Sequence, residues 1–328
     1  MHELPIISMR ILAGADGVAR RDEIAKLRHA AQRIGFLCVA DCEDDVPPEL
    51  VEQTFAMSEA LFALPRASLD RIRLNRKTDR SNRGWEGLAE QALNAKTEKG
   101  KADLNFSYRC TDDFGPELYQ RLIEQPSRPV WARFFAPNKW PDEAEIPGFR
   151  ENSLQYLHAN FKTSERIFAA LEEAFNMPTG YIVSKRTRLL DTFRRIYYPK
   201  LPTPVPAGQV GCGTHFDFGT GTIIRRRGQG CIKIKPRNSD WMEVRPPADT
   251  AIFNIGDMLQ FWSNNELQST EHGVDIGRED YSLVVFLYAD YWEELRDGVT
   301  AGSYLSDCID GSYRHMIAAE GGGVSKWG

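Results

Sequence analysis

The sequence predicts a mainly β protein with helices packed outside the β structure. After Arg188 the chain changes to short β-rich runs separated by turn residues, which is typical of an antiparallel sandwich or barrel. Before Arg188 lie segments whose apolar residues recur at helical spacing. A chain of 328 residues can bury a large core without disulfides.

The first third mixes helices with a strand. Residues 21–33 predict a helix, because their apolar residues keep helical spacing and Asp22 and Glu23 lie in the first turn. Residues 36–39 predict a strand. A proline opens a second predicted helix, over 48–65, and another proline ends it.

The middle of the chain contains one long predicted helix. Residues 71–101 are polar and are expected to form loop with short strands. From about Ser153 to Phe175, apolar residues repeat at three, four and seven, which indicates an amphipathic helix. The tail from Asp297 is expected to be ordered only in part.

The β-rich block follows a simple pattern of runs and turns. Its predicted strands cover residues 189–198, 215–227, 231–235, 250–255, 258–262 and 282–288.

Composition and charge exclude several classes of protein. The net charge of −5 offers no global basic field for nucleic acid. The longest apolar run, 283–289, is far shorter than the roughly 20 residues of a membrane helix. Residues 1–20 contain charges that do not fit a signal peptide, and six cysteines are too few for a disulfide scaffold. We therefore expect a cytoplasmic protein with no membrane, nucleic-acid or obligatory protein partner.

Three residues of the β-rich block have the chemistry of a metal site. On a strand, His215 and Asp217 would point to the same face. His272 follows Asp217 after 54 intervening residues, enough for several strands to return to the same place. Two histidines and one carboxylate form the facial triad of non-haem Fe(II) oxygenases, which leaves positions open for O₂ and substrates.

The strings around these residues carry a resemblance to a known family. They are Gly35-Phe36, Trp140-Pro141, Pro147-Gly148-Phe149-Arg150, Tyr197-Tyr198-Pro199 and the segments 214–220, 254–260 and 269–272. In this order they resemble the isopenicillin N synthase-like branch of the Fe(II)/2-oxoglutarate dioxygenases. The resemblance runs from about residue 5 to residue 310.

The resemblance implies a fold and an activity. The fold is a distorted double-stranded β-helix (jelly-roll) core with an N-terminal α/β region packed on it. The segments are then 1–110 for the α/β region, 111–187 for helices, 188–292 for the jelly roll and 293–328 for the tail. Fe(II) would be held by His215, Asp217 and His272. With 2-oxoglutarate and O₂ it would hydroxylate, desaturate or cyclise a small-molecule substrate.

At one position of the expected cosubstrate site, this sequence differs from the family pattern. The family holds the distal carboxylate of 2-oxoglutarate with an arginine in a string such as Gly-Arg-Glu-Arg-Tyr-Ser, but Asp280 takes that position here. Two unit charges 4 Å apart interact by about 4 kcal/mol at an effective dielectric of about 20. Reversing the sign at Asp280 therefore excludes an unaltered 2-oxoglutarate site.

Another cation could replace the missing arginine. If Ile224 lines the pocket, Arg226 shares its face and could bind the carboxylate or pair with Asp280. Alternatively, the arginine run 225–227 is a solvated hairpin end. The resemblance also assigns Tyr198 and Ser282 to the cosubstrate.

Two other functions stay open at this stage. An Fe(II) oxidase of the isopenicillin N synthase type would use no 2-oxoglutarate, and Asp280 could then anchor a cationic substrate. The other is a non-catalytic barrel that binds a ligand. No motif names the substrate, and the candidate wall residues are Trp85, Phe106, Tyr108 and Trp262.

Overall fold

The computed structural model describes most of the chain. The described residues are 3–74, 82–93, 102–114, 132–201, 210–228, 230–247, 249–275 and 278–312. Their helices are α1 (Met9–Leu12), α2 (Val18–His29), α3 (Pro48–Phe62), α4 (Arg66–Arg71), α7 (Phe149–Ala174), α8 (Asp257–Trp262) and α9 (Ala301–Ser312), with a π-helical turn at Ala30–Ile34 and 3₁₀ turns at Ala132–Phe135 and Val183–Lys185.

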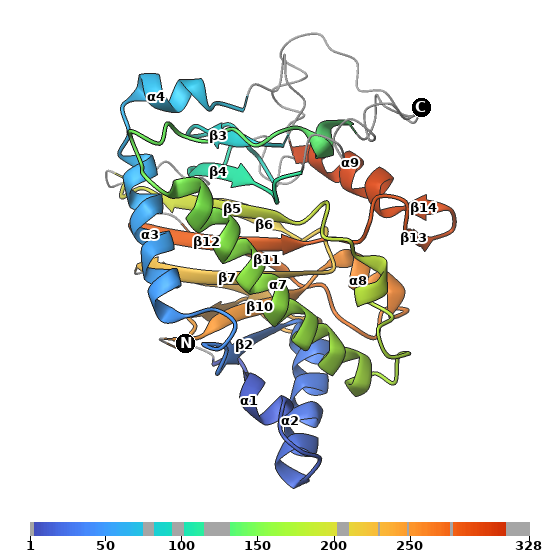
Figure 1. Cartoon of the computed structure of the whole chain (residues 1–328). Helices are drawn as coiled ribbons and strands as arrows, with labels where there is room; N and C mark the ends of the chain where they lie inside the picture. The colour runs from blue at the N-terminus through green and yellow to red at the C-terminus, as the bar shows by residue number, and fades with distance from the viewer. Residues whose placement is uncertain are drawn as a thin grey trace.

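Most described strands belong to two sheets (Figure 1). The major sheet has the order β1-β2-β10-β7-β12-β5-β4-β3, and the minor sheet has the order β6-β11-β8-β9. The major sheet comprises β1 (Ile6–Ser8), β2 (Phe36–Ala40), β3 (Gly84–Glu86), β4 (Phe106–Cys110), β5 (Thr192–Tyr198), β7 (Gly221–Gly228), β10 (Ala251–Ile255) and β12 (Asp280–Leu287). The minor sheet comprises β6 (Cys212–His215), β8 (Ile232–Lys235), β9 (Met242–Val244) and β11 (Glu271–Val274), and β13 (Glu294–Arg296) and β14 (Val299–Thr300) form a separate hairpin.

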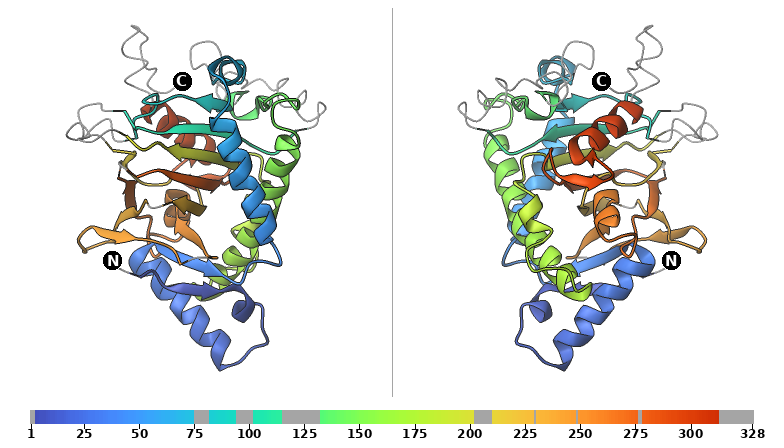
Figure 2. Two further views of the ribbon diagram at one scale, coloured as in Figure 1. Left: turned by 90° about the vertical axis from the view of Figure 1, so that its left-hand side faces the viewer. Right: turned by 90° about the vertical axis from the view of Figure 1, so that its right-hand side faces the viewer.

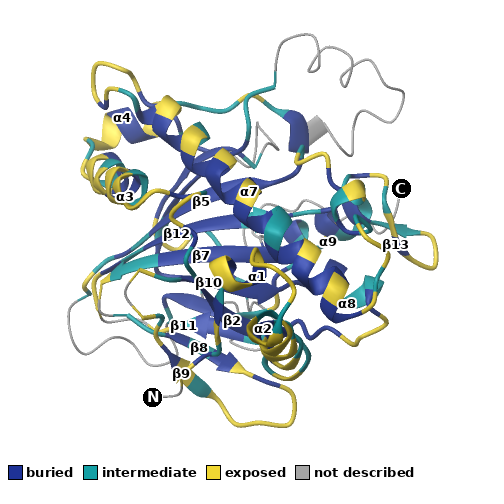
Figure 3. Ribbon diagram, turned by 60° about the horizontal axis from the view of Figure 1, so that its bottom comes forward, coloured by how far each residue is buried: buried dark blue, intermediate teal, exposed yellow. Residues whose placement is uncertain are grey.

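The two faces of the major sheet have different neighbours. One face packs on α7 and its neighbours in a large apolar core, and the helices keep exposed residues on their outer sides (Figure 3). The other face meets the minor sheet in a second core, which joins residues such as Ile196 and Ile224 to Ile232 and Ile234. Strand alternation separates the two sets, because successive side chains point to opposite faces. The mainly β fold with flanking helices is thus confirmed.

The predicted helices of the N-terminal half are present, with small shifts. The 21–33 prediction corresponds to α2 and the π-helical turn after it. This turn ends at Gly35, whose φ is +74°, and a Cβ there would lie 2.2 Å from the Gln268 carbonyl oxygen. Only glycine fits such a position, so the chain can enter β2 close to the segment before β11.

One predicted strand is wrong in its extent. The 215–227 prediction divides into β6 and β7, which belong to different sheets. Between them the chain passes so close to β12 that a Cβ at Gly219 would lie 2.2 Å from the Leu287 carbonyl oxygen. Residues 216–220 therefore form the crossing from the minor sheet to the major sheet.

A second predicted strand is also corrected. The 258–262 strand is the short helix α8, because a short apolar run does not distinguish a strand from a buried helical turn. The tail contains α9, whose Leu305 and Ile309 pack in a third apolar cluster. Figure 2 shows α9 at the opposite end of the strands from α3.

The four-segment division of the chain stays a prediction. The major sheet takes β1 to β4 from the first segment and β5, β7, β10 and β12 from the third. Among the helices in the described ranges, none combines the length and the apolar character that crossing a bilayer requires.

Candidate metal centre and its two cavities

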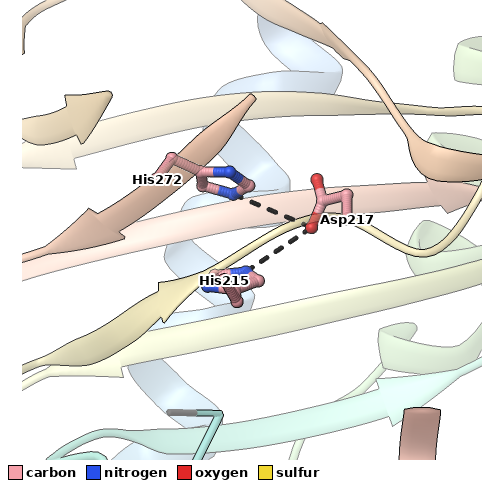
Figure 4. Close-up of side chains that lie close together, drawn as sticks. All are labelled: His215, Asp217 and His272. Atoms are coloured by element: carbon pink, nitrogen blue, oxygen red, sulfur yellow. Dashed lines mark ion pairs between the residues drawn. The ribbon is translucent and has the colours of Figure 1, made fainter. Parts of the chain in front are cut away.

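The structure brings His215, Asp217 and His272 together between the two sheets (Figure 4). His215 is the last residue of β6 and lies opposite His272 of β11 in the strand register. Their possible ligand atoms lie within 4.8 Å of one another. Asp217 Oδ1 is 3.5 Å from His215 Nε2 and 3.7 Å from His272 Nε2. Asp217 lies beyond the end of β6. Strand alternation therefore does not place Asp217 beside His215; the course of the chain after β6 does.

Hydrogen bonds to the other polar atoms of these side chains orient them. His215 Nδ1 lies 2.8 Å from the Gly213 carbonyl oxygen, and His272 Nδ1 lies 3.0 Å from that of Thr270. Asp217 Oδ2 accepts hydrogen bonds from Thr222 Oγ1 at 2.5 Å and Asn254 Nδ2 at 2.7 Å. Both Nε2 atoms and Asp217 Oδ1 therefore face one point, which is the donor set that suits Fe(II).

The negative charge of Asp217 also fits a bound cation. Burial opposes ionisation of Asp217, but the two histidines hold its pKa well below its usual range. Burial and His215 lower the pKa of His272 to about 4. Burial also disfavours the charged form of His215, yet Cys212 and Asp217 raise its pKa well above the usual value. A buried carboxylate that stays ionised between two imidazoles provides the charge that a divalent metal requires.

An inner cavity reaches from these residues into the space between the sheets. The major sheet contributes Ile196, Tyr198, Ile224, Arg226 and Ser282 to its wall. Tyr198, Arg226 and Ser282, the three residues predicted for the cosubstrate, thus line one space. Ile196 and Ile224 make this wall partly apolar.

Arg226 and Asp280 form a buried ion pair beside the inner cavity. Arg226 Nη2 lies 3.0 Å from Asp280 Oδ2, and the two side chains are 5% and 2% exposed. Arg226 Nε donates to Asp280 Oδ1 at 3.4 Å, and the Gly230 N–H donates to Oδ2 at 2.6 Å. Arg226 Nη1 is buried without a hydrogen-bond partner. Burial raises the pKa of Asp280, and the Arg226 charge opposes that rise.

This geometry corrects two expectations. The arginine run is not a solvated hairpin end, because Arg225 donates to Asn160 on α7 at 2.7 Å and Arg227 pairs with Glu52 and Glu59 on α3. Asp280 is not free to anchor a cationic substrate, because Arg226 and the Gly230 N–H occupy its two carboxylate oxygens.

A second cavity, called the outer cavity below, also borders the triad. It shares Arg194, His215, Asp217 and Phe286 with the inner cavity, and adds Gln91 and Phe216. The sequence analysis missed Arg194 and Gln91. The alternation that places Ile196 and Tyr198 in the inner cavity also points to Arg194, whereas nothing local marks Gln91.

The predicted wall residues are wrong. Trp85 and Tyr108 are buried in the large core on the helix side, and Phe106 and Trp262 pack against that core. None of them lines either cavity.

Family models match two parts of the chain. Residues 4–143 match the model described as "non-haem dioxygenase in morphine synthesis N-terminal". Residues 191–288 match the model of the 2OG-Fe(II) oxygenase superfamily. The second match contains all three residues of the triad.

Two curated relatives span most of the chain. The "2-oxoglutarate-Fe(II) type oxidoreductase hxnY" of Emericella nidulans is 25% identical over 290 residues, 86% of this chain and 78% of the relative. The "2-oxoglutarate-dependent dioxygenase gloF" of Glarea lozoyensis is 25% identical over 299 residues, 87% of each chain.

Solved structures share the fold. A Neurospora crassa protein crystallised with alpha-KG and thymine has a TM-score of 0.76 and 22% identity, and the match covers 94% of this chain and 97% of that chain. A putative 2OG-Fe(II) oxygenase family protein from Caulobacter crescentus has a TM-score of 0.73 and 21% identity, covering 94% and 98%. These neighbours confirm the jelly-roll fold.

Proposed function

Because this chain belongs to the isopenicillin N synthase-like family of Fe(II)/2-oxoglutarate dioxygenases, we propose that His215, Asp217 and His272 hold its Fe(II) and that Arg226 binds its 2-oxoglutarate. The protein is an oxidoreductase with Fe(II), 2-oxoglutarate and O₂ as its cofactor and cosubstrates. This membership favours the first of the three functions that the sequence left open over an oxidase without 2-oxoglutarate and over a non-catalytic barrel.

When held by the triad, Fe(II) would supply the O₂ chemistry. One oxygen atom of O₂ enters succinate as 2-oxoglutarate loses CO₂, and in a hydroxylation the other enters the product. The residues around the triad orient its ligand atoms, and the buried cavity walls exclude bulk water. We assign a small-molecule substrate to the outer cavity, which lies beside the triad. The Neurospora crassa neighbour carries thymine, a molecule of that size.

The observation that carries the cosubstrate assignment is the Arg226–Asp280 pair. Asp280 pairs with the Nε/Nη2 edge of the guanidinium, where Nε makes the hydrogen bond, and both Nη1 and Nη2 are buried without a hydrogen-bond partner. A guanidinium can bind one carboxylate with one edge while it donates to a second from another. Arg226 on β7 would thus supply the positive charge that the family resemblance leads us to expect at position 280, and Asp280 would orient it.

Tyr198 and Ser282 belong to the same proposed subsite. Ser282 is the cross-strand partner of Arg226 and lines the cavity with it. Tyr198 lies opposite Asp280 on β5, and its ring lies 5.9 Å from the Arg226 guanidinium carbon. Burial raises the pKa of Tyr198, so its hydroxyl stays protonated and can donate to a carboxylate.

The test is an anaerobic titration of Fe(II)-loaded protein with 2-oxoglutarate, followed by the visible charge-transfer band. We expect a saturable band, and Arg226→Gln should weaken 2-oxoglutarate binding by about 10- to 100-fold, because a hydrogen bond to a charged group contributes about 1.5–3 kcal/mol. The double variant Arg226→Gln/Asp280→Arg moves the cation to β12 and should recover affinity.

Arg227→Gln is the matched control, because it removes the neighbouring charge on the opposite face of β7. It should bind 2-oxoglutarate like the wild type. Unchanged affinity in Arg226→Gln would contradict the assignment of Arg226. No band in protein that binds Fe(II) would contradict the assignment of the cosubstrate site.

A further inference from the structure

We infer that the outer cavity takes a small carboxylic acid with an apolar, planar body, and that Arg194 pairs with the carboxylate. This inference names the substrate class of the proposed oxygenase site and therefore rests on the proposed function. It is carried by a buried guanidinium that has no carboxylate within ion-pairing distance among the described residues.

Arg194 directs its hydrogen bonds to neutral oxygens. Its Nη2 atom donates to Gln91 Oε1 at 2.8 Å, Ser107 Oγ at 3.2 Å and Asn105 Oδ1 at 3.5 Å. The residue is 5% exposed, and its Nε atom is buried without a hydrogen-bond partner. A buried charge is costly unless a counter-charge compensates it, and the polar neighbours of Arg194 supply hydrogen bonds without charge.

The neighbouring Arg109 shows what a compensated arginine looks like in this cavity. Arg109 lies opposite Arg194 in the β4–β5 register, and both donate to Gln91 Oε1. Glu86 forms a buried ion pair with Arg109. Like charges directly opposite each other are unfavourable, so a second negative group beside Arg194 would be stabilising.

Asp103 is near Arg194 but does not serve as its partner. The Asp103 oxygens accept from the backbone N–H groups of Gly213 at 2.8 Å and Leu93 at 3.3 Å. Burial raises the pKa of Asp103 to about 6, although the Arg194 charge acts in the opposite direction. The cation at the cavity wall thus remains available to an external carboxylate.

The remaining walls indicate the body of the ligand. Phe216 lies between two triad residues in the sequence and is 44% exposed, and Phe286 and Tyr288 line the same cavity with rings stacked 6.4 Å apart. Exposed aromatic surface beside a buried cation suits a flat, apolar molecule with one anionic end. Arg194 would hold that end, and the apolar body would lie beside the triad.

The test uses matched pairs of probes in which only the charge differs. Benzoate and benzamide, phenylacetate and phenylacetamide, and thymine as a neutral planar molecule are titrated by calorimetry into Mn(II)-loaded protein, with and without 2-oxoglutarate. We expect at least one acid to bind about tenfold or more tightly than its amide. Arg194→Gln should abolish this preference, and Arg194→Lys should retain part of it.

Two control variants separate this inference from the proposed function. Arg226→Gln and Arg227→Gln should both keep the preference for the acid over its amide. Only Arg226→Gln should weaken the binding of 2-oxoglutarate. Absence of any acid preference, its survival in Arg194→Gln, or tighter binding of thymine than of both acids would overturn the inference. An acid preference that depends on Arg194 in protein that does not bind 2-oxoglutarate would support the inference and contradict the proposed cosubstrate site.

Discussion

Single residues beside the triad decide how well it can hold a metal. Asp217 is bound through Oδ2 by Thr222 of β7 and Asn254 of β10, so a carboxylate from the minor-sheet side is fixed by the major sheet. Such partners orient a ligand and limit the ways in which it can turn away.

Thr222→Val should therefore lower the affinity for Fe(II) or Mn(II) by about 10- to 100-fold, because it removes one hydrogen bond to Asp217. Equilibrium metal titration under anaerobic conditions measures this change. Thr220→Val is the control, since Thr220 donates to the Leu287 carbonyl oxygen and not to Asp217. Equal metal affinities in the two variants would contradict the role assigned to Thr222.

Asp103 should make stability depend on pH. Burial raises its pKa in the folded protein to about 6, above the roughly 3.9 of an unfolded chain. The folded state then binds the proton more tightly, so this residue lowers stability as the pH rises from about 4 to about 6.

Denaturant unfolding of the wild type and Asp103→Asn between pH 4 and pH 7 measures the effect. As the pH rises over this range, we expect the unfolding free energy of the wild type to fall by about 2–3 kcal/mol relative to that of the variant. The reason is that one pKa unit corresponds to about 1.4 kcal/mol. A difference in unfolding free energy that is constant with pH would show that Asp103 titrates normally.

At the scale of elements, buried ion pairs hold the ends of the strands that carry the cavities. Asp191, just before β5, accepts from Arg186 Nη2 at 2.6 Å and from the Tyr288 N–H, just after β12, at 2.6 Å. The Arg186 and Asp191 side chains are 2% and 0% exposed. Burial raises the pKa of Asp191, and Arg186 opposes this. The pair thus joins the two cavity strands next to Tyr288.

Asp191→Ala should destabilise the protein by about 3–5 kcal/mol, because it leaves the Arg186 charge buried without its partner. Urea unfolding followed by circular dichroism gives the change in free energy. The double variant Arg186→Met/Asp191→Leu should lose less unfolding free energy than Asp191→Ala, since it removes both charges. A double variant less stable than Asp191→Ala would contradict this explanation.

At the scale of the whole molecule, metal binding should stabilise the fold. The triad forms only when β6, β11 and the crossing to β7 are in place, so the metal binds the folded state selectively. At a metal concentration about 100 times the dissociation constant, binding should add about 2.7 kcal/mol to the free energy of unfolding.

For a chain of 328 residues, that gain corresponds to a rise in Tm of about 4 °C, because the unfolding entropy is about 2.1 cal/mol/K per residue. A thermal melt with Mn(II), compared with a melt in chelator, measures it. Asp217→Ala should show no metal-dependent rise. An equal rise in the wild type and in Asp217→Ala would place the stabilising metal elsewhere on the protein.

Local patterns in the sequence determined the class of protein. The His215 and Asp217 string, the later His272 and the ordered strings around them were sufficient for the family, the cofactor and the jelly-roll fold. Helical spacing located α2, α3 and α7. These features depend on neighbours in the chain, so they are visible without a structure.

Tertiary structure decided the chemistry of the cavities. Arg226 and Asp280 are far apart in the sequence, and only the β7–β12 pairing brings them together. Likewise, Arg194 is one arginine among many until the β4–β5 register places it opposite Arg109 and at the triad. Charge compensation depends on distances across strands and between sheets, and these distances are set by register and packing, which a local pattern does not contain.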